Sequence, residues 1–187
     1  TECLCAEVSH EGRIRLAQIS MIITLLKRLS VMLLLIAFQV LMLNHLQISG
    51  YGTPIIIACM ILYMPLGSLK AGVLLWGFCT GMIVDIFSNT PGVASGAMTF
   101  AALIQPPLLK LMAPRDAAED IKPTMQTMGT ANYIRYTMII FLAHHVVYYG
   151  MECFSLYHIT DVIVLMLTSW VSSVLIALLL ETFRRTK

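Results

Sequence analysis

The chain has 187 residues, of which 58% are hydrophobic and only 12% are charged, and its formal net charge is +2. Soluble domains are about 45–50% apolar and about 25% charged. This composition therefore excludes an ordinary water-soluble globule and predicts one polytopic membrane domain with most of its surface in lipid.

The first 20 residues differ from those that follow. They are polar and lack the apolar core of a signal peptide. Met21 opens a stretch that looks like the start of a bacterial inner-membrane protein. We predict that residues 1–20 are a disordered or mis-annotated N-terminal extension, with a functional tail as the alternative, and that residues 21–187 form the membrane domain.

Six apolar segments follow, and most approach the roughly 20 residues that a helix needs to cross the hydrocarbon core. They are Leu29–Gln47, Pro54–Leu66, Leu69–Phe87, Gly92–Met112, Tyr133–Cys153 and Asp161–Phe183. We predict an all-α fold with six transmembrane helices. The second segment is short and flanked by glycine and proline, so a re-entrant segment is the alternative there.

Lysine and arginine residues favour six spans. With six, all twelve of them fall on one side of the membrane. The positive-inside rule makes that side cytoplasmic and places both termini there. If the second segment did not cross, Lys70 and the basic residues around the polar stretch Ala113–Asn132 would lie opposite the N-terminal charges.

Asp85 ends the third segment and is followed at once by the turn sequence Ile-Phe-Ser-Asn-Thr-Pro-Gly92. A carboxylate at the end of an apolar run is costly to desolvate, so it needs a partner. It could receive donors from another protein or take part in ion or proton movement. Alternatively, it bonds Ser88, Asn89 or Thr90 and caps the next helix. Pro91 and Gly92 suit the opening of that helix.

Glycines recur four apart on both sides of this turn. Gly77 and Gly81 lie in the third segment, and Gly92 and Gly96 open the fourth. Such small-xxx-small patterns let another helix approach closely. The pattern predicts packing within the bundle or, as the alternative, docking of another protein's single span.

Other polar residues in the apolar segments indicate no catalysis. Adjacent helical residues point about 100° apart, so His144 and His145 do not both face one metal. Glu152 is too far along the helix to pair with them, and we expect the histidines to fix helix packing. We found no metal-binding, redox or catalytic motif, so we expect no enzyme, no cofactor and no metal site.

With these residues in view, the chain resembles the MreD family of rod shape-determining proteins, especially its Bacteroidetes-type members, over residues 21–187. The likeness rests on Leu34–Asn44, on Gly50-Tyr-Gly-Thr-Pro54 and above all on Gly77–Gly92 with its string from Asp85. Pro114-Arg-Asp116 and the stretch from His144 to Phe154 extend it.

This resemblance implies a non-enzymatic inner-membrane scaffold of the elongasome, or rod complex. Such proteins bind the bitopic protein MreC and work with MreB, RodA and a penicillin-binding protein in lateral peptidoglycan synthesis; no nucleic acid is expected. The implied fold is similar to the substrate-binding subunits of energy-coupling-factor transporters, so a small-molecule transport subunit is the alternative. The predicted partner-binding residues are Gly77, Gly81, Asp85, Asn89, Pro91, Gly92, Gly96 and Arg115.

Overall fold

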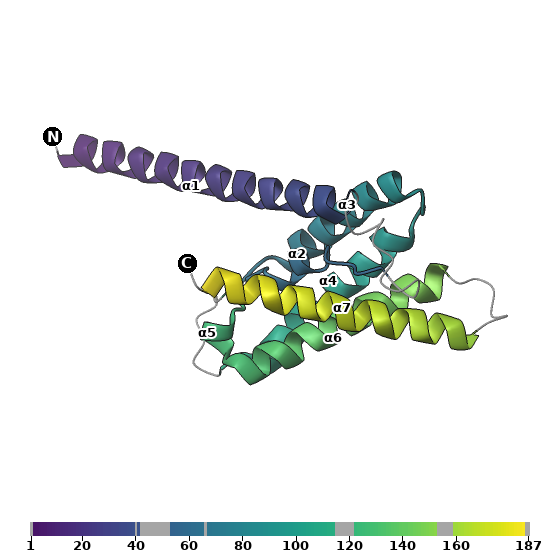
Figure 1. The fold of residues 1–187 in the computed structure, drawn as a ribbon. Coiled ribbons are helices and arrows are strands. Elements are labelled where there is room, and N and C mark those ends of the chain that lie inside the picture. The colour runs from purple at the N-terminus through teal and green to yellow at the C-terminus, as the bar shows by residue number, and fades with distance from the viewer. Residues whose placement is uncertain are drawn as a thin grey trace. The chain divides into compact units, whose positions relative to one another are not determined.

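The computed structural model describes residues 2–39, 41, 53–65, 67–114, 122–152 and 159–185. These residues form helices and contain no strand, which confirms the all-α prediction (Figure 1). In chain order the helices are α1 (Glu2–Phe38), α2 (Cys59–Leu62), α3 (Lys70–Ser88), α4 (Val93–Met112), α5 (Met125–Met128), α6 (Thr130–Glu152) and α7 (Ile159–Arg185).

The chain divides into two compact units, Thr1–Leu35 and Ile36–Lys187. The first unit consists of most of α1. This helix begins at Glu2 and so includes residues 2–20. Where the native chain begins stays a prediction. From Ile22 to Leu34, α1 carries many exposed large apolar side chains, which suit a lipid environment better than water.

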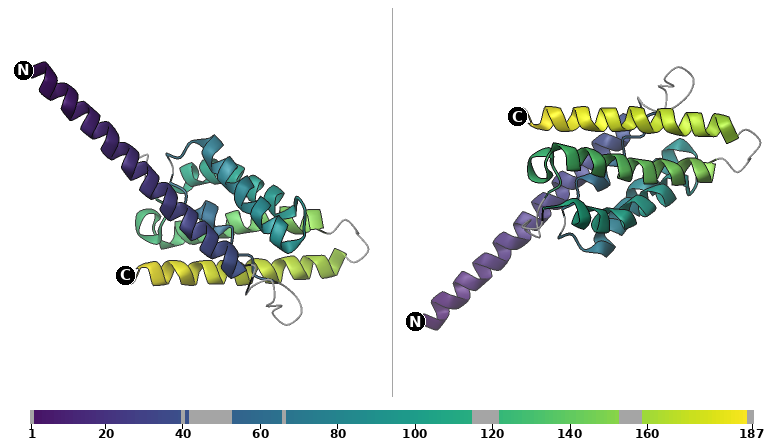
Figure 2. Two further views of the ribbon diagram at one scale, coloured as in Figure 1. Left: turned by 90° about the horizontal axis from the view of Figure 1, so that it is seen from above. Right: turned by 90° about the horizontal axis from the view of Figure 1, so that it is seen from below.

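The second unit is built from two helix pairs. Helix α3 packs against α4, and α6 packs against α7, while contacts between α4 and α6 join the pairs. Figure 2 shows α6 and α7 running side by side in both views. Small and aromatic residues fill the centre, with Ala97, Met98, Ala101 and Phe141 fully buried.

The predicted second helix, Pro54–Leu66, does not form. Residues 53–58 have no helical structure, and α2 is only four residues long. Every residue from Pro54 to Leu62 is buried, which is what non-helical backbone would require if it lay within a bilayer. The prediction of a spanning helix failed because an apolar run can be a buried helix or a buried non-helical segment, and the β-branched Ile55–Ile57 lower the helix propensity here.

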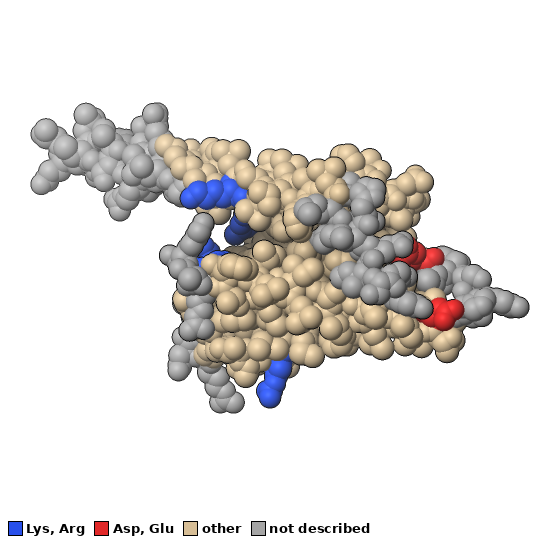
Figure 3. All heavy atoms as spheres, in the orientation of Figure 1, with Lys and Arg blue, Asp and Glu red and all other residues tan. Residues whose placement is uncertain are grey.

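Two described helices, Lys70–Ser88 and Ile159–Arg184, are long and apolar enough to cross a membrane. This supports membrane association. The second of the six predicted spanning helices is absent, and spanning by the other predicted segments stays a prediction. The helix order places the described basic residues of the second unit at one end, where α3 and α6 begin and α4 and α7 end. Figure 3 shows acidic side chains at the end of the bundle opposite the C-terminus.

Candidate functional site

Asp85 forms a cap for the helix that follows its own. It is 6% exposed, and its carboxylate accepts hydrogen bonds from the backbone N–H groups of Ala94 at 2.8 Å and Ser95 at 2.9 Å. The Gly92 N–H and the Thr90 hydroxyl add longer bonds at 3.2 Å each. The first N–H groups of a helix have no partner within it, so a carboxylate here stabilises α4 directly. The capping interpretation of Asp85 is confirmed.

The glycines of α3 make this cap possible because they bring α4 close. A Cβ added at Gly81 would lie 2.4 Å from the Cα of Ser95, and one at Gly77 would lie 3.0 Å from the Met98 carbonyl oxygen. Both glycines are buried. This glycine face is therefore occupied by α4, in agreement with packing within the bundle. It does not receive another protein while α4 is in place.

The remaining predicted partner-binding residues lie around the turn between α3 and α4. Asn89 and Pro91 are exposed, and Asn89 adopts the left-handed conformation at φ 54°. Gly92 is also exposed and has φ +90°, which side-chain-bearing residues rarely adopt. Gly96 is partly buried beside Met151. Arg115 lies outside the described residues.

A groove runs along the outer side of α3 and α4. Its volume is about 490 Å³, and its lining is mainly apolar. It is lined by Leu74, Phe78, Gly92, Ser95, Gly96, Thr99, Phe100 and Leu103. Four of these (Gly92, Gly96, Thr99 and Leu103) follow one stripe of α4 at helical spacing. Gly92 thus lies on an open surface and Gly96 lines the groove next to Met151 of α6, whereas the α3 glycines are covered by α4.

Side chains hold the start of the buried segment from Pro54 to Leu62, whereas backbone bonds link the residues from Ile56 to Met64. At its start, Gln39 donates to the Pro54 carbonyl and accepts from the Ile56 N–H, at 3.1 and 2.8 Å. The Ile55 N–H donates to the Ser173 hydroxyl at 2.7 Å. These bonds satisfy backbone groups that would otherwise be buried without partners.

The far end of this segment is anchored by two other helices. The Gln105 amide of α4 donates to the Met64 carbonyl at 3.1 Å, and the Tyr136 hydroxyl of α6 donates to the Leu62 carbonyl at 3.4 Å. Sequence reasoning noted Gln39 only as part of a family likeness and missed the others. The sequence marks Ser173, Gln105 and Tyr136 only as polar residues within apolar helices.

We predict that Ser173→Ala lowers the free energy of unfolding by about 2 kcal/mol, because it leaves the buried Ile55 N–H without an acceptor. Ser172→Ala is the matched control, since the Ser172 hydroxyl donates to the Ser169 carbonyl of its own helix and has no bond to segment 53–65. Thermal unfolding of the full chain in detergent measures both. Equal effects of the two substitutions would contradict the anchoring role of Ser173.

His145 fixes helix packing, as predicted. Its Nδ1 lies 2.7 Å from the Phe141 carbonyl, so it donates there, and its Nε2 lies 3.2 Å from the Ser173 hydroxyl of α7. His144 is fully buried, and its ring stacks on Tyr148 with 6.0 Å between the centroids. Neither of its nitrogens has a hydrogen-bond partner among the described residues.

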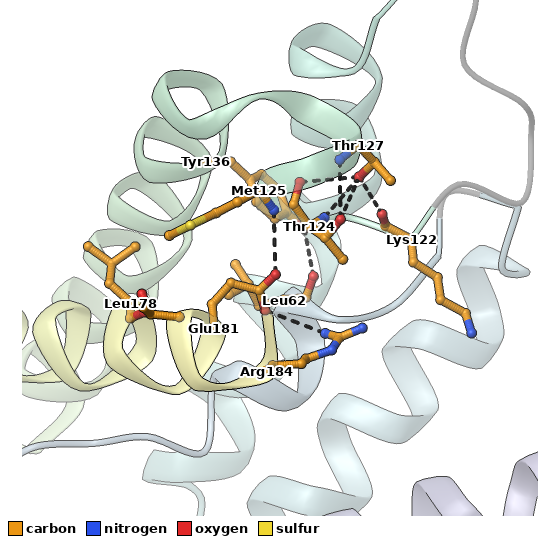
Figure 4. Close-up of polar contacts among 10 residues, drawn as sticks. Leu62, Lys122, Thr124, Met125, Thr127, Tyr136, Leu178, Glu181 and Arg184 are labelled. Atoms are coloured by element: carbon orange, nitrogen blue, oxygen red, sulfur yellow. Dashed lines mark hydrogen bonds and ion pairs between the residues drawn. The ribbon is translucent and has the colours of Figure 1, made fainter. Parts of the chain in front are cut away.

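A second polar cluster lies at the basic end of the bundle, between α5 and α7 (Figure 4). Glu181 of α7 is buried and accepts from the Met125 N–H at 3.4 Å, while Arg184 pairs with it at 3.5 Å. The Arg184 guanidinium also sits over the Tyr63 ring, 4.9 Å from its centroid. Sequence reasoning placed Arg184 among the cytoplasmic charges and missed the buried acid beside it.

The described residues contain no group of three or more side chains that could hold a metal ion. Comparisons with protein-family models, with curated proteins and with solved structures found no match for this chain. Among the described residues, two candidate sites are the groove on α3 and α4 and the cluster around Glu181. The groove is a candidate surface for the predicted partner. The cluster around Glu181 was not predicted from the sequence.

Proposed function

We propose that this chain is a non-enzymatic, multi-pass inner-membrane scaffold that binds the transmembrane helix of MreC within the elongasome. The observation that carries the proposal is the groove on α3 and α4. Helices associate in lipid through close packing of small residues. Gly92, Gly96 and Thr99 put small residues along the floor of this groove, and Phe78 and Phe100 line it with large apolar ones.

The binding face differs from the one suggested by the glycine pattern alone. Because Gly77 and Gly81 are covered by α4, the proposed partner lies along the outer stripe of α4. Asn89 and Pro91, both exposed at the turn, would meet the residues just outside the partner's span. Asp85 acts indirectly, by holding the first turn of α4 in place.

The groove also bears on the alternative of a transport subunit. A site for a polar small molecule needs several convergent polar groups in a concave pocket. The polar side chains lining this groove are only Ser95 and Thr99, and Thr99 donates to the backbone of its own helix. The lining favours an apolar helix over a vitamin-like ligand.

Photo-crosslinking in cells tests the proposal. A photoreactive amino acid placed at Leu103 or Leu74, which line the groove, is expected to capture MreC. The matched control is Leu75, the neighbour of Leu74, which is 64% exposed but lies outside the groove lining. The proposal would be wrong if MreC were captured from Leu75 at the same yield. It would also be wrong if a normally expressed chain gave no capture of MreC from Leu103.

A further inference from the structure

Glu181 is a buried carboxylate whose capacity for hydrogen bonds is only partly used. Its side chain is 4% exposed. Oε1 accepts one long bond from the Met125 N–H, and no hydrogen bond reaches Oε2 from any described residue, although Arg184 lies 3.5 Å away. A carboxylate has about four acceptor positions, and burial without donors is costly. Among the described residues, the Met125 N–H at 3.4 Å and the Arg184 guanidinium at 3.5 Å are thus the neighbouring donors of this carboxylate, and acceptor positions remain unused.

A small cavity adjoins the carboxylate. Its volume is about 100 Å³, and it is lined by Thr124, Met125, Gln126, Glu181 and Arg184. One water molecule needs only about 10–15 Å³ by the same measure, so the cavity has room for a larger group. Gln126 and Arg184 are exposed at its rim, and Glu181 lies buried within its wall.

Arg184 supplies the opposite charge beside this acid. Its side chain is 48% exposed, and the Tyr63 ring beneath it restricts its position. A buried acid short of donors therefore neighbours a held guanidinium with donors to spare. This arrangement complements a ligand that carries an ammonium group and an anionic group a few bonds apart.

The surroundings indicate which ligand of that kind reaches the pocket. The site lies at the end of α7, a helix apolar enough to span a membrane. Leu180 and Phe183, on either side of Glu181 in the chain, are exposed, Phe183 to 72%. Acyl chains would cover such side chains, whereas a soluble metabolite would leave them in contact with water.

We propose that this pocket binds the headgroup of an ethanolamine phospholipid. The ammonium group donates to Glu181, and the phosphate accepts from Arg184. A choline headgroup does not fit the same chemistry, because its quaternary nitrogen has no N–H to donate. The inference goes beyond the scaffold proposal and requires only that the chain lies in a membrane.

Native mass spectrometry of the full chain, released from nanodiscs that mix the two lipids with identical acyl chains, tests this. We expect phosphatidylethanolamine to be retained about tenfold over phosphatidylcholine, the scale of one or two charge-assisted hydrogen bonds. Glu181→Gln and Arg184→Gln should each lower this preference. Arg135→Gln, an exposed arginine at the same end that does not line the pocket, should not.

Four results would overturn the proposal. One is equal retention of the two lipids by the unaltered chain, and another is an unchanged preference in folded Glu181→Gln. The third is that free phosphoethanolamine stabilises the chain against thermal unfolding as strongly as the lipid does. That result would make the ligand a soluble molecule. If Glu181→Gln does not fold, Gln126→Trp is the variant that tests the proposal. Gln126 is exposed and lines the pocket, so the larger side chain fills the pocket without changing a buried residue. A preference that survives this variant also contradicts the proposal.

Discussion

Asp85→Ala is expected to lower the free energy of unfolding by about 3 kcal/mol, because it removes the acceptor of buried backbone N–H groups in the first turn of α4. The size follows from losing a cap and leaving at least one buried donor without a partner. Asp85→Asn keeps one carbonyl oxygen and is expected to lose about half as much. Thermal unfolding of the full chain in detergent measures both losses.

Asp161→Ala is the control for this comparison. Asp161 is an exposed acid in the first turn of α7, so its removal should cost only about 0.3–1 kcal/mol through the helix dipole. If Asp85→Ala were no more destabilising than Asp161→Ala, the capping role would be wrong. A loss of crosslinking to MreC with unchanged stability would instead indicate that Asp85 contacts the partner directly.

Gly81→Ala is expected to destabilise the chain by about 3 kcal/mol or more, because the added methyl group meets backbone and not a flexible side chain. Its Cβ would lie 2.4 Å from the Ser95 Cα and 2.6 Å from the Ala94 carbonyl oxygen. Forcing atoms into a filled interface costs about 1–3 kcal/mol, and more where backbone must move. The same shift would lengthen the bonds from Asp85 to α4.

Gly72→Ala gives a matched control in the same helix. The nearest atom to a Cβ there is the Leu69 Cβ at 3.9 Å, an ordinary contact. Alanine is the better helix former, so this change should be neutral or stabilising by up to about 1 kcal/mol. Equal losses at both positions would show that glycine flexibility, and not the approach of α4, makes Gly81 necessary.

Four helices were placed well from the sequence. The predicted Gly92–Met112 differs by one residue from α4, and Leu69–Phe87 by one at each end from α3. Tyr133–Cys153 and Asp161–Phe183 correspond to α6 and α7 within about three residues. These segments end at clear polar or turn residues, such as the Ser-Asn-Thr-Pro sequence after Phe87. Their limits can therefore be predicted from the local sequence.

Two segments were placed poorly, and for different reasons. The first was expected to begin at Leu29, but α1 begins at Glu2, because polar residues without proline or glycine breaks after Gly12 continue a helix as readily as apolar ones. The second was expected as a helix over Pro54–Leu66. Its conformation depends on bonds from distant residues such as Gln39 and Ser173, which no local pattern contains.

The motif around Asp85 also shows what the sequence and the tertiary structure each determine. The sequence by itself determined that the acid lies at the end of an apolar helix, next to a turn that opens another, and that capping was one of its possible roles. Only the tertiary structure decided that it caps α4 and that Gly77 and Gly81 are covered by that helix. It also decided that Gly92 and Gly96 line the open groove. The physical reason is that composition and spacing report what each helix face prefers, whereas partners are chosen by packing among residues far apart in the chain.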